Sequence, residues 1–284
     1  MSFRLPAAPP SALEYFATLV QTDDGLPLLE AATCLAQDAS PQLDVQAVLA
    51  DVDGLLSRLK RKLPADAAGM HKLRVLNAFF FGELGFSGNV NDYYAPANSY
   101  LPEVLRTRRG IPISLAVLWL ELARGVSLQA DGVGFPGHFM VKVRLPQGQV
   151  VLDPFTGESQ SPEQLAERIA AFRPDDAWRE ETEVPLALYL QPTSAREMLA
   201  RMLRNLREIH RSSNDVDQWF AVQDRLIVLT PKAWAEYRDR GLMHAAQGRI
   251  AQAMQDVQTY VAQQRRAPDA GTLREQLQRW ANEG

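Results

Sequence analysis

Three polar side chains in the middle of the chain could together form a nucleophilic relay. Ser114 lies just after Pro112 at the predicted start of a helix, His138 begins a predicted strand, and Asp153 ends the strand that returns from it. In such a relay the histidine takes the proton of the nucleophile, and the aspartate fixes the orientation of the imidazole. A helix N-terminus also stabilises negative charge on a nucleophile or an oxyanion. Each residue type equally has a structural use, as a cap, a packed histidine or a turn residue, so spacing alone leaves both interpretations open.

The elements that must position these residues are indicated by composition and period. Residues 112–124 are apolar on nearly every side, which predicts a buried, central helix. Apolar and polar residues alternate over 139–145, which predicts a strand, and the turn LPQGQ with the following VVLD predicts its antiparallel partner. A helix followed by an antiparallel sheet is typical of an α+β fold. Neighbouring antiparallel strands can place His138 beside Asp153.

A glycine pattern directly precedes the histidine. Gly132, Gly134 and Gly137 spell G-x-G-x-x-G. A dinucleotide-binding loop of this pattern follows a strand and opens a helix, whose N-terminus holds the pyrophosphate. Here Pro136 precedes the last glycine and a strand follows, so no dinucleotide and no other cofactor is expected. The better interpretation is a tight turn or bulge between two strands, which sets His138 at the start of the second strand.

Helices are predicted on both sides of this centre, and the residues between them have loop composition. The predicted helical regions are 12–82, with apolar residues at helical spacing, a short helix at 100–108, and helices at 161–172 and 195–211. Residues 85–99 are rich in Gly, Asn, Asp, Pro and Ser, which predicts a loop. Most arginines of 195–211 lie off its apolar stripe. They are interpreted as a solvated face, with an anion- or partner-binding surface as the alternative.

The C-terminal part carries a repeat-like pattern. Gly241, Gly248, Ala253 and Val257 fall near the spacings of a tetratricopeptide unit, and the preceding 34 residues end in Pro231. The alternative is an ordinary helical bundle. Tetratricopeptide-like helices would give the chain a surface for binding a protein.

Composition argues against several classes of protein. The 284 residues carry a net charge of −4, which disfavours nucleic acid and anionic membrane as partners. No run approaches the roughly 18 apolar residues of a membrane span, and the N-terminus lacks an apolar signal-peptide core. The single cysteine, Cys34, excludes an internal disulfide, and the four histidines are too dispersed to indicate a metal site. A cytoplasmic protein without a metal is therefore expected.

Several stretches resemble the bacterial SirB-type transglutaminase-like family. In the centre of the chain they are NDYYAPANSYLPEVLRTRRGIPISLAVLWLELA, GVGFPGHFMVKV and VLDPFTGE. YLQPTSAREMLARMLRNLREIH and the repeat-like tail resemble the family's tetratricopeptide-containing C-terminal part, so the resemblance covers roughly residues 80–265. It implies a papain-related core, in which a central helix packs against a small antiparallel sheet, with a helical N-terminal region and C-terminal tetratricopeptide-like helices. The expected domains are a transglutaminase-like domain over 1–185 and a helical domain over 186–284.

The resemblance also implies the positions of the family's catalytic residues. The family places a cysteine at a helix start and then a histidine and an aspartate on neighbouring strands; these positions fall on Ser114, His138 and Asp153. Ser114 thus replaces a thiol, and a serine hydroxyl needs stronger base assistance than a thiolate. We therefore favour a binding or adaptor protein, with a residual Ser-His-Asp pocket, for a protein or peptide partner. The alternative is a serine-dependent hydrolase or acyltransferase that attacks an amide or ester through the same residues.

Polar and aromatic residues near the motif are candidates for lining the cleft. They are Asn91, Asp92, Tyr93 and Tyr94 of the loop, and Arg108 and Arg109. Loops that hold such groups often form binding sites. The equally acceptable alternative is a solvated loop and a charge pair at a helix end.

Overall fold

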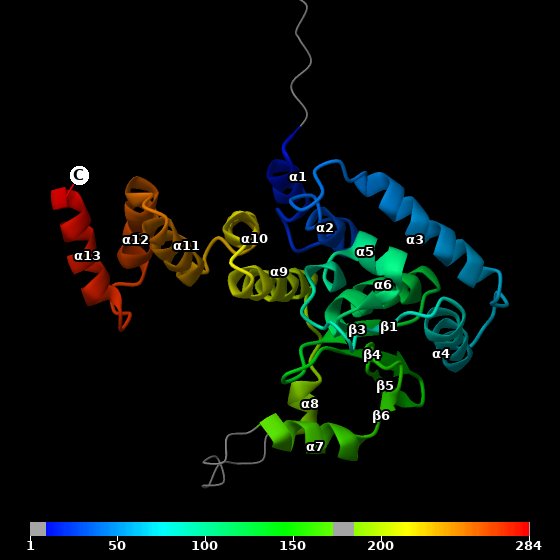
Figure 1. Cartoon of the computed structure of the whole chain (residues 1–284). Helices are drawn as coiled ribbons and strands as arrows, with labels where there is room; N and C mark the ends of the chain where they lie inside the picture. The colour runs from blue at the N-terminus through cyan, green and yellow to red at the C-terminus, as the bar shows by residue number, and fades with distance from the viewer. Residues whose placement is uncertain (1–9, 173–184, 284) are drawn as a thin grey trace, which may run out of the picture.

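The computed structural model describes residues 10–172 and 185–283. Its N-terminal part is helical, as the apolar spacing predicted (Figure 1). The elements are α1 (Ala12–Leu19), α2 (Leu28–Cys34), α3 (Val45–Lys60), α4 (Gly69–Asn77) and a π-helical turn, η1 (Ala78–Glu83). Polar side chains begin two of these helices: Ser11 Oγ accepts the N–H of Glu14 at 3.2 Å, and Asp44 Oδ1 accepts the N–H of Ala47 at 3.1 Å.

The predicted helix and hairpin form the centre of the molecule. The helices there are α5 (Leu101–Thr107) and α6 (Pro112–Gly125), preceded by a 3₁₀ turn, η2 (Pro96–Asn98). A four-stranded antiparallel sheet runs in the order β3 (Ala130–Val133), β4 (Met140–Leu145), β5 (Gly148–Leu152), β6 (Ser159–Gln160). The two-residue strands β1 (Ser87–Gly88) and β2 (Arg109–Gly110) pair in parallel. Helix α6 is buried along most of its length and packs against β3 and β4, which confirms a mixed helix-and-sheet fold.

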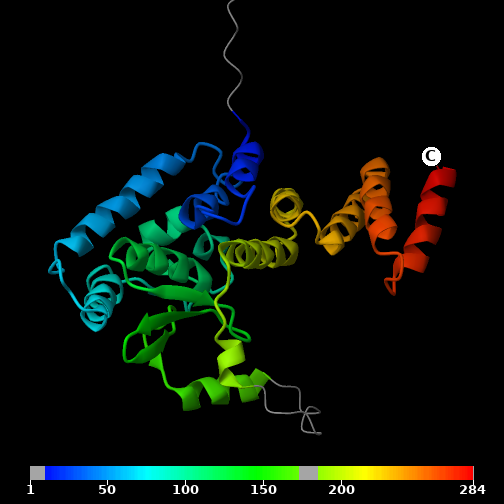
Figure 2. The same cartoon turned by 180° about the vertical axis from the view of Figure 1, so that it is seen from behind.

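Helices return after the sheet. They are α7 (Pro162–Phe172), α8 (Leu186–Tyr189), α9 (Ala195–Ser212), α10 (Val216–Leu229), α11 (Trp234–Ala246), α12 (Ile250–Gln263) and α13 (Ala270–Glu283). Helices α11, α12 and α13 pack on one another in sequence and extend to one side as an arm (Figures 1 and 2). Gly241 lies where a Cβ would stand 2.8 Å from Val257, so the predicted repeat residues bring α11 and α12 into close contact.

The buried apolar residues form separate clusters, and the boundary between these clusters does not fall at residue 185. One large cluster joins α1–α6, part of the sheet, and apolar residues of α9 and α10 as far as Leu229. A separate cluster holds α12 and α13 together, with Ala253, Val257 and Trp280 among its members. The core around α6 thus continues past residue 185, where a domain boundary is expected from the sequence.

Candidate functional site

The glycine pattern forms the turn that precedes His138. Gly132 lies in β3, and residues 134–139 connect β3 to β4. His138 therefore lies in this connection, two residues before β4 begins at Met140, and does not begin the strand as the sequence predicted. Gly137 has a φ of +63°, and a Cβ there would stand 1.8 Å from the ring of Phe172 at the end of α7. A side chain is thus disfavoured by the backbone conformation, and the Phe172 ring would have to move to make room for it. The N–H of His138 donates to the carbonyl of Phe135 at 3.0 Å, which closes the turn.

His138 and Asp153 meet across the hairpin. Val141 of β4 faces Leu152 of β5, so the residues just outside these strands come together. His138 Nε2 lies 2.8 Å from Asp153 Oδ1, with 2% of the aspartate side chain and 19% of the imidazole exposed. The structure thus places His138 and Asp153 side by side, as expected for neighbouring antiparallel strands. The imidazole reaches solvent and the carboxylate does not.

The carboxylate of Asp153 is held by more than the histidine. The backbone N–H of Phe155 donates to Oδ1 at 2.9 Å, and Arg168 Nη2 lies 3.4 Å from Oδ2. Burial raises the pKa of Asp153, but the hydrogen bond and charge of His138, the Phe155 amide and Arg168 together outweigh burial, and the net pKa is lowered. Asp153 is therefore ionised at neutral pH and can orient the imidazole.

Ser114 has other hydrogen-bond partners than this pair. Its side chain is fully buried, and its hydroxyl oxygen lies 2.6 Å from the carbonyl oxygen of Asn98 and 3.0 Å from that of Ile111. The same oxygen accepts the N–H of Ile111 at 3.1 Å. A Cβ at Gly110 would stand 2.8 Å from this oxygen. Among the described residues, the hydrogen bonds of Ser114 thus go to backbone groups of Ile111, just before α6, and of Asn98 in η2, and none goes to His138.

Cys34 offers no substitute thiol. It is fully buried in α2, and burial raises the pKa of the thiol to about 12. The thiolate, which is the nucleophilic form, is therefore absent near neutral pH.

Asn98 connects Ser114 to the loop that carries the tyrosines. The Asn98 amide donates to the carbonyls of Asp92 at 2.6 Å and Tyr93 at 3.1 Å, and its Oδ1 accepts from the Asn89 amide at 3.0 Å. The backbone carbonyl of Asn98 meanwhile accepts the Ser114 hydroxyl. One buried asparagine thus fixes both the loop and the first turn of α6. Asn98 was not among the residues predicted to form the site, because nothing in its local sequence pattern indicates these contacts.

Tyr93 and Tyr94 line a small cavity. The Tyr93 ring packs on Phe155 with centroids 6.0 Å apart, and Tyr94 is 75% exposed. The cavity, of about 280 Å³, is lined by Tyr93, Tyr94, Ile111, Asn205, Glu208, Ile209 and Ser212. Two of the predicted cleft residues therefore face α9. Because Phe155 follows Asp153 closely, the Tyr93 wall adjoins the His138–Asp153 pair.

The other predicted cleft residues lie elsewhere. Asn91 and Asp92 are exposed and do not line the cavity. The guanidinium of Arg108 lies 4.7 Å from the centre of the Phe86 ring, and Arg109 donates to the carbonyl of Gly85 at 2.8 Å. The structure does not bring these four residues to the tyrosine cavity, and their part in binding stays a prediction.

Arg201 of α9 joins the site without having been singled out by the sequence. Its Nη2 donates to the backbone carbonyl of His138 at 2.8 Å, and its guanidinium lies 5.4 Å from the centre of the Phe139 ring. Burial lowers the pKa of Arg201, and Tyr93 opposes that shift. Within the described residues no carboxylate forms an ion pair with it. In the sequence, Arg201 was distinguished only as one of the arginines that lie outside the apolar stripe of the helix, which does not indicate a contact with His138.

Neither a membrane span nor a metal cluster is found in the part of the chain that the structure describes. No helix there is long and apolar enough to cross a membrane. No group of three or more His, Cys, Asp or Glu side chains in residues 10–172 and 185–283 could hold a metal ion.

Comparison with known proteins identifies relatives of both parts of the chain. A family model for the transglutaminase-like superfamily matches residues 46–204, and one for the tetratricopeptide repeat matches residues 206–278. A UPF0162 protein of Xylella fastidiosa strain 9a5c is 36% identical over 240 residues, which cover 84% of each chain. A UPF0162 protein of Pseudomonas aeruginosa is 30% identical over 213 residues, covering 75% of this chain and 76% of that one.

A less similar relative matches a larger part of the chain. The UPF0162 protein YchA of Escherichia coli K12 is 25% identical over 256 residues, covering 88% of this chain and 91% of its own. The crystal structure of menin superposes over 88% of this chain and 68% of menin, with 12% identity and a TM-score of 0.39. The relatives are named UPF0162 proteins, so the SirB-type name stays a resemblance.

Proposed function

Because the chain belongs to the transglutaminase-like superfamily and carries a tetratricopeptide-repeat region, we propose that it is a protein-interaction module with a residual Ser-His-Asp site. The observation that carries this proposal is the burial of Ser114, whose hydroxyl donates to the backbone carbonyl of Asn98 at 2.6 Å, with the carbonyl of Ile111 as a second acceptor at 3.0 Å. A nucleophilic serine needs a base within hydrogen-bond reach and a path for the substrate. Ser114 in this arrangement caps and anchors a helix.

The proposed binding site is the groove between the tyrosine loop and α9. The cavity beside Tyr93 and Tyr94 suits one apolar or aromatic side chain of a peptide. His138 and Arg201 do not line the cavity itself, but Arg201 lies close enough to Tyr93 to oppose the rise of its pKa, and it bonds to the carbonyl of His138. In the proposal both residues lie at the end of the groove and supply hydrogen-bond donors for the peptide's carbonyl or carboxylate oxygens. In this role Asp153 keeps the imidazole oriented for recognition. The repeat helices α11–α13 provide a second surface for the same protein partner.

Selection of peptides on full-length protein tests the proposal. Peptides selected from a displayed random library are measured by fluorescence anisotropy against the wild type, Tyr94→Ala and Arg201→Gln. We expect each substitution to weaken binding of groove peptides about tenfold, since an anchor or a charged donor is lost. Arg204→Gln, a more exposed arginine on the same helix, is the matched control. Affinities that are unchanged in both Tyr94→Ala and Arg201→Gln would contradict the proposed groove.

Arg109→Ala tests the rest of the predicted cleft. If Arg108 and Arg109 line the groove together with Asn91 and Asp92, selected peptides should bind Arg109→Ala more weakly. Unchanged affinity would confine the groove to the tyrosines and α9.

One observation favours a second function, that of an acyl hydrolase or acyltransferase. The 2.8 Å bond between His138 and an ionised Asp153 is the arrangement that a general base requires. In this alternative Ser114 attacks an amide or ester carbonyl, and backbone N–H groups of residues 113–115 stabilise the oxyanion. It requires the Ser114 hydroxyl to leave the Asn98 carbonyl and reach His138.

A further inference from the structure

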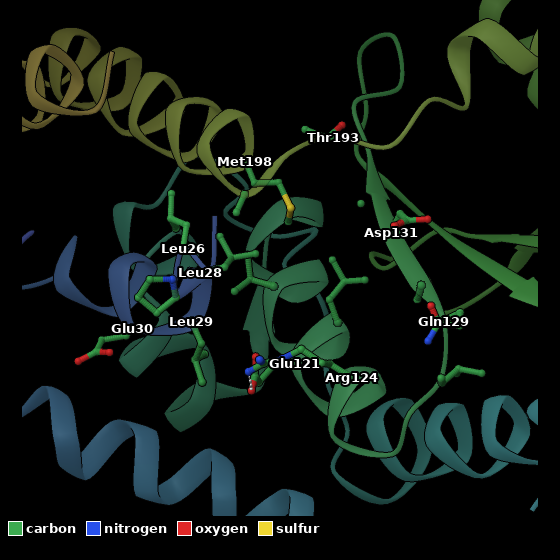
Figure 3. A pocket seen from close by; sticks show the side chains of 18 of the residues that line it. Leu26, Leu28, Leu29, Glu30, Glu121, Arg124, Gln129, Asp131, Thr193 and Met198 are labelled. Atoms are coloured by element: carbon green, nitrogen blue, oxygen red, sulfur yellow. Dashed lines mark hydrogen bonds and ion pairs between the residues drawn. The ribbon is translucent and has the colours of Figure 1, made fainter. Parts of the chain in front are cut away.

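A larger cavity, of about 720 Å³, lies along α6 in a place that the proposed groove does not include. Figure 3 shows it between the first turn of α2, with the segment before it, on one side and β3 on the other, with α6 between them and Met198 of α9 at one end. None of the residues of the His138 site lines it. We propose that this cavity, called here the β3 groove, binds an extended, positively charged segment of a partner protein, which adds to the sheet as a strand beside β3.

The edge of β3 provides the backbone groups for such pairing. β3 pairs with β4 on one side and is the outermost strand of its sheet. The carbonyl of Gly132 points away from β4, because it accepts the N–H of Thr193 at 2.8 Å. Along a strand the backbone N–H and carbonyl groups of one residue point to one side, and those of the next residue point to the other side. Ala130 lies two residues before Gly132, so its N–H and carbonyl also point away from β4, to the free edge. No strand of the described chain pairs with that edge at Ala130. Such an edge is a template for an incoming strand.

Apolar side chains form the floor and the far wall of the β3 groove. Val117 and Leu120 come from α6, Leu26 and Leu29 from the segment opposite β3, and Met198 from α9. Alternate side chains of an extended strand point to one face. A strand paired with β3 would therefore rest every second side chain on this apolar surface.

The charges of the wall opposite β3 select a cationic segment. Glu30 accepts hydrogen bonds from the neutral Tyr15 and Gln46 side chains, and Asp53 is exposed. Neither carboxylate forms an ion pair within the described residues. The other two carboxylates that line the groove form ion pairs. Glu121 pairs with Arg124 at 2.5 Å, and Asp131 pairs with Arg144 at 3.3 Å. Lysine or arginine side chains of the incoming segment would complement Glu30 and Asp53.

The length of the paired segment is limited at both ends. Thr193 and Pro192 already occupy the edge at Gly132 and Val133. At the other end the chain turns at Ser127, which has a φ of +56°. The free edge therefore accepts a short stretch of partner backbone, which pairs around Ala130.

Defined peptides test the β3 groove on the full-length protein. The probe is a fluorescein-labelled hexapeptide that alternates lysine and valine. Its counterparts carry N-methyl groups on alternate amides, in both registers, or glutamate in place of lysine. We expect saturable binding of the lysine–valine peptide in fluorescence anisotropy. At least one N-methylated register and the glutamate peptide should bind about tenfold more weakly, because backbone pairing or charge is lost.

Protein variants locate the binding. Ala130→Pro removes the outward N–H of β3 without removing a bond to β4, and it should weaken binding about tenfold. Asp53→Asn should weaken it about threefold, and Asp51→Asn on the same helix, outside the groove, should leave it unchanged. The N-methylated peptides need no altered protein, so the test stands even if Ala130→Pro does not fold.

Three results would overturn the proposal. They are the absence of saturable binding, equal binding of both N-methylated registers and the unmodified peptide, and equal binding of the glutamate peptide. Equal binding of N-methylated peptides would mean attraction by charge alone. None of these results bears on the groove at Tyr94, which is tested by its own substitutions.

Discussion

The hydroxyl of Ser114 contributes to stability because it satisfies buried backbone groups at the junction of α6 and the Asn98 turn. Ser114→Ala leaves these groups without the hydroxyl, so we expect a loss of about 1–3 kcal/mol in the free energy of unfolding. Chemical denaturation measures this loss. The matched control is Ser57→Ala, at an exposed site of α3, which should stay within about 0.5 kcal/mol of the wild type. Equal stability of Ser114→Ala and Ser57→Ala would contradict a structural role for Ser114.

Asp153 makes stability depend on pH in the acid range. Its pKa in the folded protein lies below the ordinary 3.8, so its ionised form stabilises the fold. This contribution is fully present above the ordinary pKa and is lost as the pH falls through the lowered pKa. We expect Asp153→Asn to be less stable than the wild type near pH 6, and the difference to shrink as the pH falls below about 4. A difference independent of pH would contradict this account.

At the scale of elements, the turn between β3 and β4 is set by Gly137. Gly137→Ala adds a Cβ at a φ of +63° and against the Phe172 ring. Gly85→Ala is the matched control, because Gly85 has a φ of +70° with nothing within 4 Å of the added Cβ. We expect Gly137→Ala to lower the free energy of unfolding by about 1 kcal/mol more than Gly85→Ala. Equal losses would show that Phe172 does not brace the turn.

The elements were predictable from the sequence because their signals are local. The apolar run of α6 and the alternation in β4 each lie within a dozen or so residues, and the glycine turn is bounded by the two strands. The pairing of His138 with Asp153 was predictable as well, because both flank one hairpin. The other contacts at the site were not predictable in this way. Ser114 bonds to Asn98, 16 residues away, and Arg201 reaches His138 from 63 residues away. Such contacts depend on how the helices pack, which spacing along the chain does not determine.

At the scale of the whole molecule, the core around α6 extends into the C-terminal half. Met198, Leu206 and Leu229 belong to its apolar cluster, and Arg225 of α10, 1% exposed, pairs with Asp38 of the N-terminal part. We therefore expect a chain ending after residue 230 to unfold cooperatively and one ending after residue 190 to lose cooperative unfolding, as followed by circular dichroism. This pair of truncations tests the domain boundary proposed at 185/186. A cooperative transition in the shorter chain would support that boundary and contradict our expectation.

We propose that Ser114 supports the fold and does not act as a nucleophile. Reaction of the purified protein with a serine-directed fluorophosphonate, read by mass spectrometry of the intact protein and its peptides, tests this role of Ser114. The buried hydroxyl predicts no adduct at Ser114 in the wild type, and the same result for Ser114→Ala and His138→Ala. An adduct on Ser114 that disappears in His138→Ala would contradict the claim and establish a working relay of Ser114, His138 and Asp153.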